Sequence, residues 1–387
     1  MERHMIFHIF NSSLISGPET LAMPALAEIK DKAQIIWLRE ARVSDEKQKH
    51  VASYMQSYGL TYHTIPVESR LDKQAVQKLK ELFEKTENLE VAHAHDVKAS
   101  FYLLKASEQI QNRKFQTIST HHGVFARSGF INHMYEKYYA HFILPKLDRT
   151  LTVCSSDRLV LIKRGLKPAQ VVAHLNGVTR NRISQTDRLA AQKKIRQDWG
   201  LNVSEDTFVF GVAARLDHEK RHNLILDVAH ELKSNHPNFK FVILCFGRGP
   251  LEESLKKRTK LLGLDNNVQW RGYRSHLGQE FAGFDSLLSL SSAEGLPINL
   301  IESGWAATPV FASNVNGVGD LVTAESLGTL VAADEDVKSI AAKIVGFAAS
   351  KEKLAQVGLN FQAHVEKHFS QAEWLKNLLE IYRMGKG

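Results

Sequence analysis

The sequence predicts an α/β fold in which two doubly wound domains face each other across a cleft. Short apolar runs alternate with amphipathic stretches along the whole chain, which is typical of parallel sheets with helices on both faces. The runs are uniformly apolar, as expected for strands that are covered on both sides. With 387 residues, the chain is also too long for one ordinary core, which favours two domains.

Eleven apolar runs are predicted to be strands, in two sets. The first set covers 5–10, 34–38, 89–95, 115–120 and 149–154. The second set covers 207–214, 240–246, 267–272, 285–291, 309–313 and 328–333. A polar, basic stretch from about 176 to 206 interrupts this rhythm. We therefore expect the boundary there, with one domain in residues 1–175 and the other in residues 176–369.

The composition favours a globular protein of a reducing compartment. Hydrophobic residues make up 43% of the chain, and its two cysteines, Cys154 and Cys245, lie in apolar runs where a free thiol packs as a small hydrophobe. No apolar run approaches the roughly 20 residues that span a bilayer. The first residues, MERHMIFHIFN, have the pattern of a strand rather than of a signal peptide. We therefore expect a cytoplasmic protein.

The formal net charge of +8 is concentrated in one window. Between Asp157 and Arg196 there are ten Lys or Arg residues against two acids, and ten minus two equals the surplus of the whole chain. Such a zone attracts phosphates or anionic lipid headgroups, or it is simply a solvated helical face. No aromatic-rich or helix-turn-helix pattern accompanies the charge, so nucleic acid is not an expected partner.

The segment SSAEGLPINLIE, residues 291–302, carries the richest pattern. A strand runs into a loop with Glu294, and Pro297 stands where a helix is expected to begin and to offer free N–H groups to an anion. Glu302 is expected on the same element, roughly 12 Å from Glu294 at a helical rise of about 1.5 Å per residue. Two carboxylates so spaced suit the two ends of a nucleotide sugar. Glu294 alone could instead be a first-turn acid that complements the helix dipole.

A second pattern is FGVAARLDHEKRHNLIL, in which a strand is expected to end at Arg215 and the next helix to begin near Lys220. Arginine can donate two parallel hydrogen bonds to phosphate oxygens, and lysine supplies a compact positive charge. Together they could neutralise a departing diphosphate. The alternative is two surface cations. We disfavour it, because cations at a helix N-terminus oppose the dipole unless an anion is present.

Three further loops are candidates for ligand contact. His121 and His122 precede Gly123 at the end of a strand, where one of them could contact a sugar or an acceptor hydroxyl. Gly17 opens a helix after the first strand and could let backbone approach a phosphate. Gly247, in the CFGRGP turn, permits close backbone approach to a base, or belongs to a plain tight turn.

Two patterns could suggest a metal, and neither is favoured. The run His93-Ala94-His95-Asp96 lacks further ligands with zinc-like spacing, so a packed or hydrogen-bonded role is expected for both histidines. The run Asp334-Glu335-Asp336 precedes a helix and is expected to cap it. We expect no metal and no cofactor.

These motifs together resemble the retaining glycosyltransferases of glycosyltransferase family 4, which have the GT-B fold of two Rossmann-like domains. The resemblance is strongest over residues 150–387. GVAARLDHEKRHNLIL is similar to the family's strand-R-x4-K-helix segment, AEGLPINLIE to its E-x7-E motif and HLNGV to its connector. The last helix, within residues 370–387, looks like the one that packs back onto the N-terminal domain in the family.

The resemblance implies a role for each matching position. Glu294 would hold hydroxyls of the donor sugar, Glu302 would bind the ribose, and Arg215 and Lys220 would clamp the diphosphate. His122 would lie beside the transferred sugar, with His121 as the alternate. The donor site would be completed by Gly295, Leu296, Pro297, Gly17 and Gly247. Arg248 stands where the family usually has an acid, and Ala307 where it often has glycine.

The resemblance implies a metal-independent, retaining transfer of a hexose from a nucleotide diphosphate sugar, expected to be a UDP-sugar. The N-terminal domain would hold the acceptor, a hydroxyl of a cell-envelope glycan, lipopolysaccharide or glycolipid. Alternatives on the same fold are a nucleotide-sugar 2-epimerase, a sugar-phosphate synthase, or a non-catalytic sugar-nucleotide-binding protein. The basic window and the aromatic segment 130–147 could dock the enzyme on an anionic membrane, or the segment could be a core helix and loop.

Overall fold

The computed structural model describes residues 4–384 apart from 12, 14, 16, 70, 124–133, 135, 275 and 276. The chain forms two compact units, each with its own sheet and core. Unit 1 comprises Met1–Gly177 and Gln371–Gly387, and unit 2 comprises Val178–Ser370. Each unit is described by itself.

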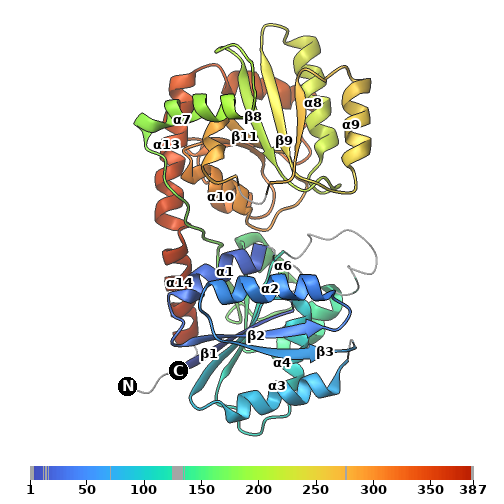
Figure 1. The fold of residues 1–387 in the computed structure, drawn as a ribbon, viewed down its shortest axis with the longest axis vertical. Helices are drawn as coiled ribbons and strands as arrows, with labels where there is room; N and C mark the ends of the chain where they lie inside the picture. The colour runs from blue at the N-terminus through green and yellow to red at the C-terminus, as the bar shows by residue number, and fades with distance from the viewer. Residues whose placement is uncertain are drawn as a thin grey trace. The chain divides into compact units, whose positions relative to one another are not determined.

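Unit 1 is built on a parallel sheet of seven strands in the order β3-β2-β1-β4-β5-β6-β7. Its strands are β1 (Met5–Phe10), β2 (Ala33–Glu40), β3 (Tyr62–Val67), β4 (Leu89–Ala94), β5 (Gln116–His121), β6 (Arg149–Thr152) and β7 (Val171–Ala173). Its helices are α1 (Gly17–Ala27), α2 (Asp45–Ser57), α3 (Lys73–Lys85), α4 (Val97–Ser107), η1 (Tyr139–Ile143), η2 (Leu144–Lys146), α6 (Ser155–Lys163) and α14 (Gln371–Arg383). Side chains of α3 and α4 form one core with alternate residues of β1 and β4, and α14 covers the other face (Figure 1).

Unit 2 has a parallel sheet of six strands in the order β10-β9-β8-β11-β12-β13. Its strands are β8 (Phe208–Ala213), β9 (Phe241–Phe246), β10 (Val268–Gly272), β11 (Ser286–Ser289), β12 (Val310–Ser313) and β13 (Gly328–Val331). Its helices are α7 (Gln185–Asp198), α8 (His222–Asn235), α9 (Glu252–Leu261), η3 (Gly278–Gly283), α10 (Ile298–Trp305), α11 (Val318–Leu321), α12 (Val337–Phe347) and α13 (Lys351–His368). Residues of α8, α9 and α12 share a core with one face of this sheet.

Every predicted strand is present, and two strands escaped prediction. β3 has the sequence YHTIPV, in which polar residues and Pro66 mask the apolar pattern. It tolerates them because it lies at the edge of the sheet, where one side of the backbone needs no partner strand. β7, at the other edge, is only three residues long. The polar stretch from 176 to 206 also contains a helix, α7, none of whose described side chains is buried.

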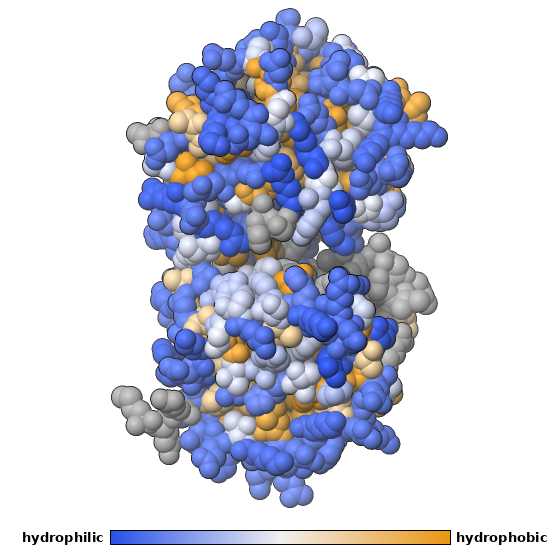
Figure 2. Space-filling view, in the orientation of Figure 1, coloured by the Kyte–Doolittle hydropathy of each residue, from blue (hydrophilic) through white to orange (hydrophobic). Residues whose placement is uncertain are grey.

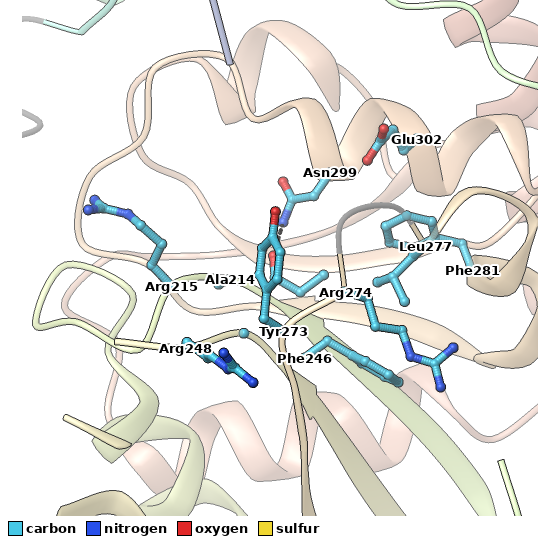
Figure 3. Close-up of a pocket in the computed structure, with 12 residues that line it drawn as sticks. Ala214, Arg215, Phe246, Arg248, Tyr273, Arg274, Leu277, Phe281, Asn299 and Glu302 are labelled. Atoms are coloured by element: carbon cyan, nitrogen blue, oxygen red, sulfur yellow. Dashed lines mark hydrogen bonds between the residues drawn. The ribbon is translucent and has the colours of Figure 1, made fainter. Parts of the chain in front are cut away.

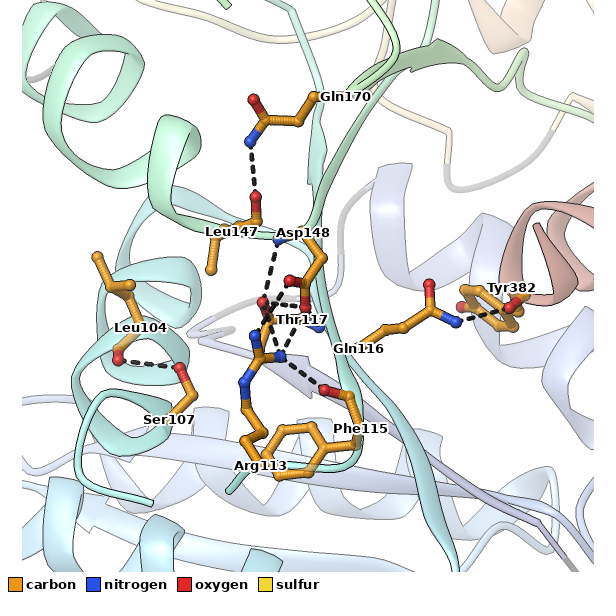
Figure 4. A network of polar contacts seen from close by, with 10 residues as sticks. All are labelled: Leu104, Ser107, Arg113, Phe115, Gln116, Thr117, Leu147, Asp148, Gln170 and Tyr382. Atoms are coloured by element: carbon orange, nitrogen blue, oxygen red, sulfur yellow. Dashed lines mark hydrogen bonds and ion pairs between the residues drawn. The ribbon is translucent and has the colours of Figure 1, made fainter. Parts of the chain in front are cut away.

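The C-terminal helix α14 is fixed to unit 1 by hydrogen bonds from several strands. Tyr382 Oη lies 2.7 Å from His93 Nδ1 in β4, and Gln116 Nε2 of β5 donates to the Tyr382 carbonyl at 2.8 Å (Figure 4). Next to Gln116, Arg113 donates one hydrogen bond to each carboxylate oxygen of Asp148 and so joins the loops that precede β5 and β6. A carboxylate that receives such a bidentate pair is held strongly. The docking of α14 thus adds 17 residues to unit 1 that are distant in sequence.

The surface is mostly hydrophilic on the face seen in Figure 2, where apolar residues are exposed singly or in small groups. Both cysteines are buried free thiols, as predicted. Among the described residues, no helix is both long enough and apolar enough to cross a membrane.

Histidines line the face of the unit 1 sheet that α14 covers. His8, His93, His95 and His174 are all buried. Burial lowers the pKa of His8 to about 3 and that of His174 to about 4. Burial also lowers the pKa values of His93 and His95 well below the usual range. The folded state therefore holds these rings neutral at pH values where the unfolded chain would protonate them.

We predict that the stability of the protein falls as the pH decreases below about 6.5. The folded pKa values are depressed, so the unfolded state binds more protons between pH 6.5 and about 4, and the free energy of unfolding must fall across that window. Each such histidine contributes up to about 1.4 kcal/mol per pH unit. Urea denaturation from pH 7.5 to 4.5 measures the slope. His8→Gln should flatten it and His50→Gln, at an exposed site on α2, should not; equal slopes in all three proteins would contradict this origin.

The packing of α13 against the end of α10 requires a glycine. A Cβ atom added at Gly358 of α13 would lie 2.1 Å from the Ala307 carbonyl oxygen. Ala307 follows α10 with φ of +52°, and the Thr308 N–H donates to the Ser303 carbonyl at 2.9 Å, which closes a Schellman-type C-cap. The frequent family glycine at position 307 is thus explained by this left-handed cap.

We predict that Gly358→Ala destabilises unit 2 by about 1–3 kcal/mol, because the new methyl group must displace backbone. The matched control is Gly346→Ala in α12, where an added Cβ would meet nothing within 4 Å. There the substitution should be neutral or stabilising by up to about 1 kcal/mol, since alanine favours a helix. Chemical denaturation of both variants measures the difference; equal stabilities would show that the contact is relieved without cost.

Candidate functional site

The candidate site lies where the strand order of the unit 2 sheet reverses. β8 pairs with β9 on one side and with β11 on the other, and the chain winds outward from this pair in both directions. In open parallel sheets, ligands bind beyond the carboxyl ends of the strands at such a switch point. The loop after β8 carries Arg215 and Lys220, and the loop after β11 carries Glu294. The topology therefore brings these predicted residues together.

Lys220 and Glu294 form an ion pair between the two loops. Lys220 Nζ lies 2.5 Å from Glu294 Oε1, and the same oxygen accepts a hydrogen bond from Ser291 Oγ at 2.7 Å. The side chains are only 19% and 9% exposed. The loops are also tied through their backbone, since the Ser292 N–H donates to the Glu219 carbonyl at 2.8 Å. The loops after β8 and β11 are thus held together by side-chain and backbone contacts, at a place that we call the junction.

Arg215 is different, because its side chain is 72% exposed. Its Nη2 lies 2.9 Å from Asp217 Oδ2 and 3.7 Å from Glu219 Oε2. Anions are therefore present beside both cations, as the sequence predicts, but the chain itself supplies them: Asp217 and Glu219 for Arg215, and Glu294 for Lys220.

A pocket of about 350 Å³ adjoins the loop after β8, with Arg215 in its lining (Figure 3), whereas Lys220 and Glu294 are not among its lining residues. Its lining residues are Ala213, Ala214, Arg215, Phe246, Gly247, Arg248, Tyr273, Arg274, Leu277, Phe281, Asn299 and Glu302. Aromatic and apolar side chains form one part, and Arg215 and Glu302 contribute charge at its borders. A volume of this size suits a small-molecule ligand. Tyr273, Arg274 and Asn299 escaped sequence analysis, because no spacing rule connects them with the other lining residues.

Glu302 lies on α10, but Glu294 lies in the preceding loop, so the expectation of one shared element is wrong. α10 spans only Ile298–Trp305, with Pro297 as its N-cap, and a helical rise cannot be applied between the two carboxylates. Glu302 is paired with Arg180, whose Nη2 lies 2.6 Å from Oε1. Arg180 was predicted only as one of many cations in the basic window.

The remaining predicted donor-site residues have roles in the loops themselves. Leu296 is buried, and the Gly295 carbonyl accepts a hydrogen bond from the Gly317 N–H at 3.0 Å. A Cβ atom at Gly247 would lie 1.9 Å from the Ala214 carbonyl oxygen, and one at Gly249 would lie 2.3 Å from that of Leu216. The glycines of this turn therefore permit close approach to the protein's own backbone, which shapes the pocket wall.

The other predicted residues, Gly17, His121 and His122, belong to unit 1. Gly17 is the first residue of α1, as expected. The Gly123 N–H donates to His121 Nδ1 at 3.2 Å, so His121 carries its proton on Nε2, which lies 3.0 Å from Glu136 Oε2. Both nitrogens of His121 are thus engaged. His122 Nε2, in contrast, is a buried atom that has no hydrogen-bond partner among the described residues.

Three histidines form the group most like a metal site in the described part of the chain. Ligand atoms of His8, His93 and His95 lie within 4.8 Å of one another. His8 Nδ1 is hydrogen-bonded to His95 Nε2 at 2.9 Å, and His93 is hydrogen-bonded through both nitrogens, to Tyr382 and Thr120. The predicted hydrogen-bonded role of His93 and His95 is confirmed. The Asp336 side chain accepts from two N–H groups at the start of α12, which confirms the predicted cap.

The cations of the basic window are largely occupied within the chain. Ion-pair or hydrogen-bond partners are seen for Arg158, Arg180, Arg182, Arg188, Lys194 and Arg196. The window also spans the boundary at Gly177, so its two halves belong to different units. Many of its cations therefore serve local structural contacts within each unit.

Comparisons with known proteins agree with this geometry. Residues 192–363 match the family model of glycosyl transferases group 1. The chain is 25% identical over 177 residues to the lipopolysaccharide core biosynthesis mannosyltransferase LpsB of Rhizobium meliloti (strain 1021), covering 44% of this chain and 50% of LpsB. It is 26% identical over 250 residues to the D-inositol 3-phosphate glycosyltransferase of Rhodococcus jostii (strain RHA1), covering 60% and 53%. The chain spans about half the length of the curated relatives it matches.

Solved structures resemble the chain over nearly its whole length. The crystal structure of Anabaena HepE in complex with UDP and glucose aligns with a TM-score of 0.79 at 16% identity, covering 98% of this chain and all of HepE. Identity at this level shows the fold. The chain therefore has the GT-B fold, and its residues 192–363 match the model of the glycosyl transferases group 1 family.

Proposed function

We propose that this protein is a retaining, metal-independent glycosyltransferase that moves a hexose from a UDP-sugar to an acceptor hydroxyl of a cell-envelope glycan or glycolipid. The observation that carries the proposal is the Lys220–Glu294 pair at the switch point of unit 2, beside a pocket of about 350 Å³. The choice of UDP is supported by HepE, which was crystallised with UDP. The acceptor class is supported by LpsB, a lipopolysaccharide core enzyme.

The ion pair supplies a mechanism for donor capture. A diphosphate that enters the junction competes with Glu294 for Lys220, and with Asp217 and Glu219 for Arg215. Lys220 and Arg215 then neutralise the diphosphate, and Glu294 is released to accept hydrogen bonds from hydroxyls of the donor sugar. Such groups accelerate the reaction when they stabilise charge that develops on the leaving phosphate. Glu302, at the border of the pocket, would accept the ribose hydroxyls.

The transfer step needs no enzymic nucleophile in this proposal. The bond between the anomeric carbon and the phosphate oxygen breaks, and the acceptor oxygen bonds to the same face of the sugar. The leaving phosphate takes the proton of the acceptor hydroxyl.

His122 is proposed to contact the transferred sugar, in preference to His121. Burial, together with nearby His121 and His174, lowers the pKa of His122 to about 3. The ring is therefore neutral at physiological pH and a weak base, so its contribution is a hydrogen bond through Nε2 rather than removal of a proton. His121 instead positions Gly123 and bonds to Glu136.

We predict that Glu294→Ala lowers the rate of sugar transfer by about 100-fold or more, while UDP binding is partly retained. Loss of the carboxylate removes contacts to the sugar but leaves Arg215 and Lys220 for the diphosphate. Transfer is measured as UDP released upon addition of acceptor, and binding by calorimetry. The control is Glu253→Ala at an exposed position of α9, which should behave as wild type. Normal turnover by Glu294→Ala would refute the assignment.

We also propose that unit 1 docks on an anionic membrane through the face formed by Met134, Tyr138 and Phe142. These residues are four apart, so they share one helical face. Each is about half exposed or more, and the Tyr138 and Phe142 rings stack at 5.3 Å. The neighbouring residues Tyr139 and Ile143 are buried, so the segment also has the alternative core role considered from sequence.

We predict that the protein floats with vesicles that contain phosphatidylglycerol, and that Phe142→Glu abolishes flotation. An inserted carboxylate opposes both apolar burial and the negative surface. Leu261→Glu, at an exposed apolar position of α9, is the matched control and should still float. Absence of binding by the wild-type protein at low salt would contradict docking.

A further inference from the structure

Arg180 lies in the segment that leads from Gly177 into α7, and this segment is fixed within unit 2. The Val178 N–H donates to the Phe369 carbonyl at 2.8 Å, and Trp305 Nε1 of α10 donates to the Val178 carbonyl at 2.7 Å. Arg180 Nη1 donates to the neighbouring Thr179 carbonyl at 3.1 Å. The backbone that carries Arg180 is therefore held against α10, the helix that presents Glu302 to the pocket.

The contact between Arg180 and Glu302 involves only one oxygen of the carboxylate. Arg180 Nε donates to Oε1 at 2.8 Å and Nη2 lies 2.6 Å from the same oxygen. Among the contacts of the described residues, Oε2 has no hydrogen-bond or ion-pair partner. The two side chains are 29% and 16% exposed, so solvent screens the pair only in part. One hydrogen bond from Nε and the close approach of the charged Nη2 thus hold Oε1 and leave the second oxygen available.

The contact with Arg180 restricts the conformations that the Glu302 side chain can adopt. A glutamate side chain has three rotatable bonds, and ordering it on ligand binding costs entropy. It also stands in a pocket whose lining includes Arg215, Arg248 and Arg274, any of which could attract a free carboxylate. With Oε1 held by Arg180, Glu302 is ordered before the ligand arrives, and preorganisation of this kind raises affinity.

We infer that Arg180 is a positioning residue that holds Glu302 so that Oε2 can accept the ribose hydroxyls of the donor nucleotide. The inference rests on the proposed function, which places the ribose at Glu302. Neither the basic window nor the connector motif assigns this role to Arg180.

The test follows the logic of a double-mutant cycle: one change removes Arg180 from the protein, and the other removes the ribose hydroxyls from the nucleotide. Binding of UDP and of 2′,3′-dideoxy-UDP is measured by calorimetry for wild type, Arg180→Ala and Arg180→Lys. We expect Arg180→Ala to weaken UDP binding by about tenfold and to leave dideoxy-UDP binding nearly unchanged, because charge-assisted hydrogen bonds to the hydroxyls are lost. Arg180→Lys should be intermediate, since an ammonium group can hold Oε1 but without the fork.

Arg182→Ala is the matched control. Arg182 is two residues further along the segment, and it contacts Gln362 and Glu366 of α13 instead of the pocket. It should bind both nucleotides as wild type does. Thermal unfolding of each variant reports whether it folds, and Arg180→Lys keeps the cycle decisive if Arg180→Ala does not.

The outcomes separate the inference from the proposed function. Equal weakening of UDP and dideoxy-UDP by Arg180→Ala would overturn the inference alone, and so would tighter UDP binding, which would show that Arg180 competes with the ribose. If the wild-type protein bound none of UDP, GDP and ADP, the proposed function would fail first. If it bound GDP or ADP in place of UDP, the same cycle with the matching dideoxy nucleotide decides the role of Arg180.

Discussion

The contact on which the candidate site depends is the ion pair between Lys220 and Glu294. Neither charge is well solvated, and a charge that is removed from water is tolerated only when it is paired. The pair can form because β8 and β11 are neighbours in the sheet, although 74 residues separate the two side chains in sequence. The order of the strands thus decides which loops meet, and the loops decide which charges meet.

The same principle extends to the other charges of the site. Arg215 is balanced by Asp217 and Glu219, and Glu302 by Arg180. A site without ligand that left these groups unpaired would carry strong local fields with a cost in stability. With internal partners, that cost is avoided. In the proposed function, a diphosphate would displace the carboxylates from Arg215 and Lys220, whereas Arg180 would keep its contact with Glu302. The affinity for the nucleotide would then be a difference between two sets of ion pairs.

Local patterns could predict much of the fold and part of the site. Arg215, Lys220 and Glu294 lie in loops that follow buried strands, and the ends of these apolar runs made the loops recognisable. The partners of these residues were not, because Arg180 is 122 positions from Glu302 and His93 is 289 positions from Tyr382. Gly358 likewise gave no signal, since its requirement arises from the Ala307 carbonyl of another helix end. Sequence pattern reports burial and local geometry, whereas these contacts arise from tertiary packing.

His121 and His122 illustrate the difference between what a local sequence pattern predicts and what tertiary contacts determine. They are adjacent and of one residue type, and only the family resemblance favours His122 over His121. The structure separates them, because Gly123 and Glu136 occupy both nitrogens of His121 and thereby fix its tautomer. His122 keeps one buried nitrogen without a partner among the described residues, and burial keeps its ring neutral. A sugar hydroxyl at His122 Nε2 would satisfy an atom that has no partner among the described residues, which supports the choice of His122 over His121 in the proposed function.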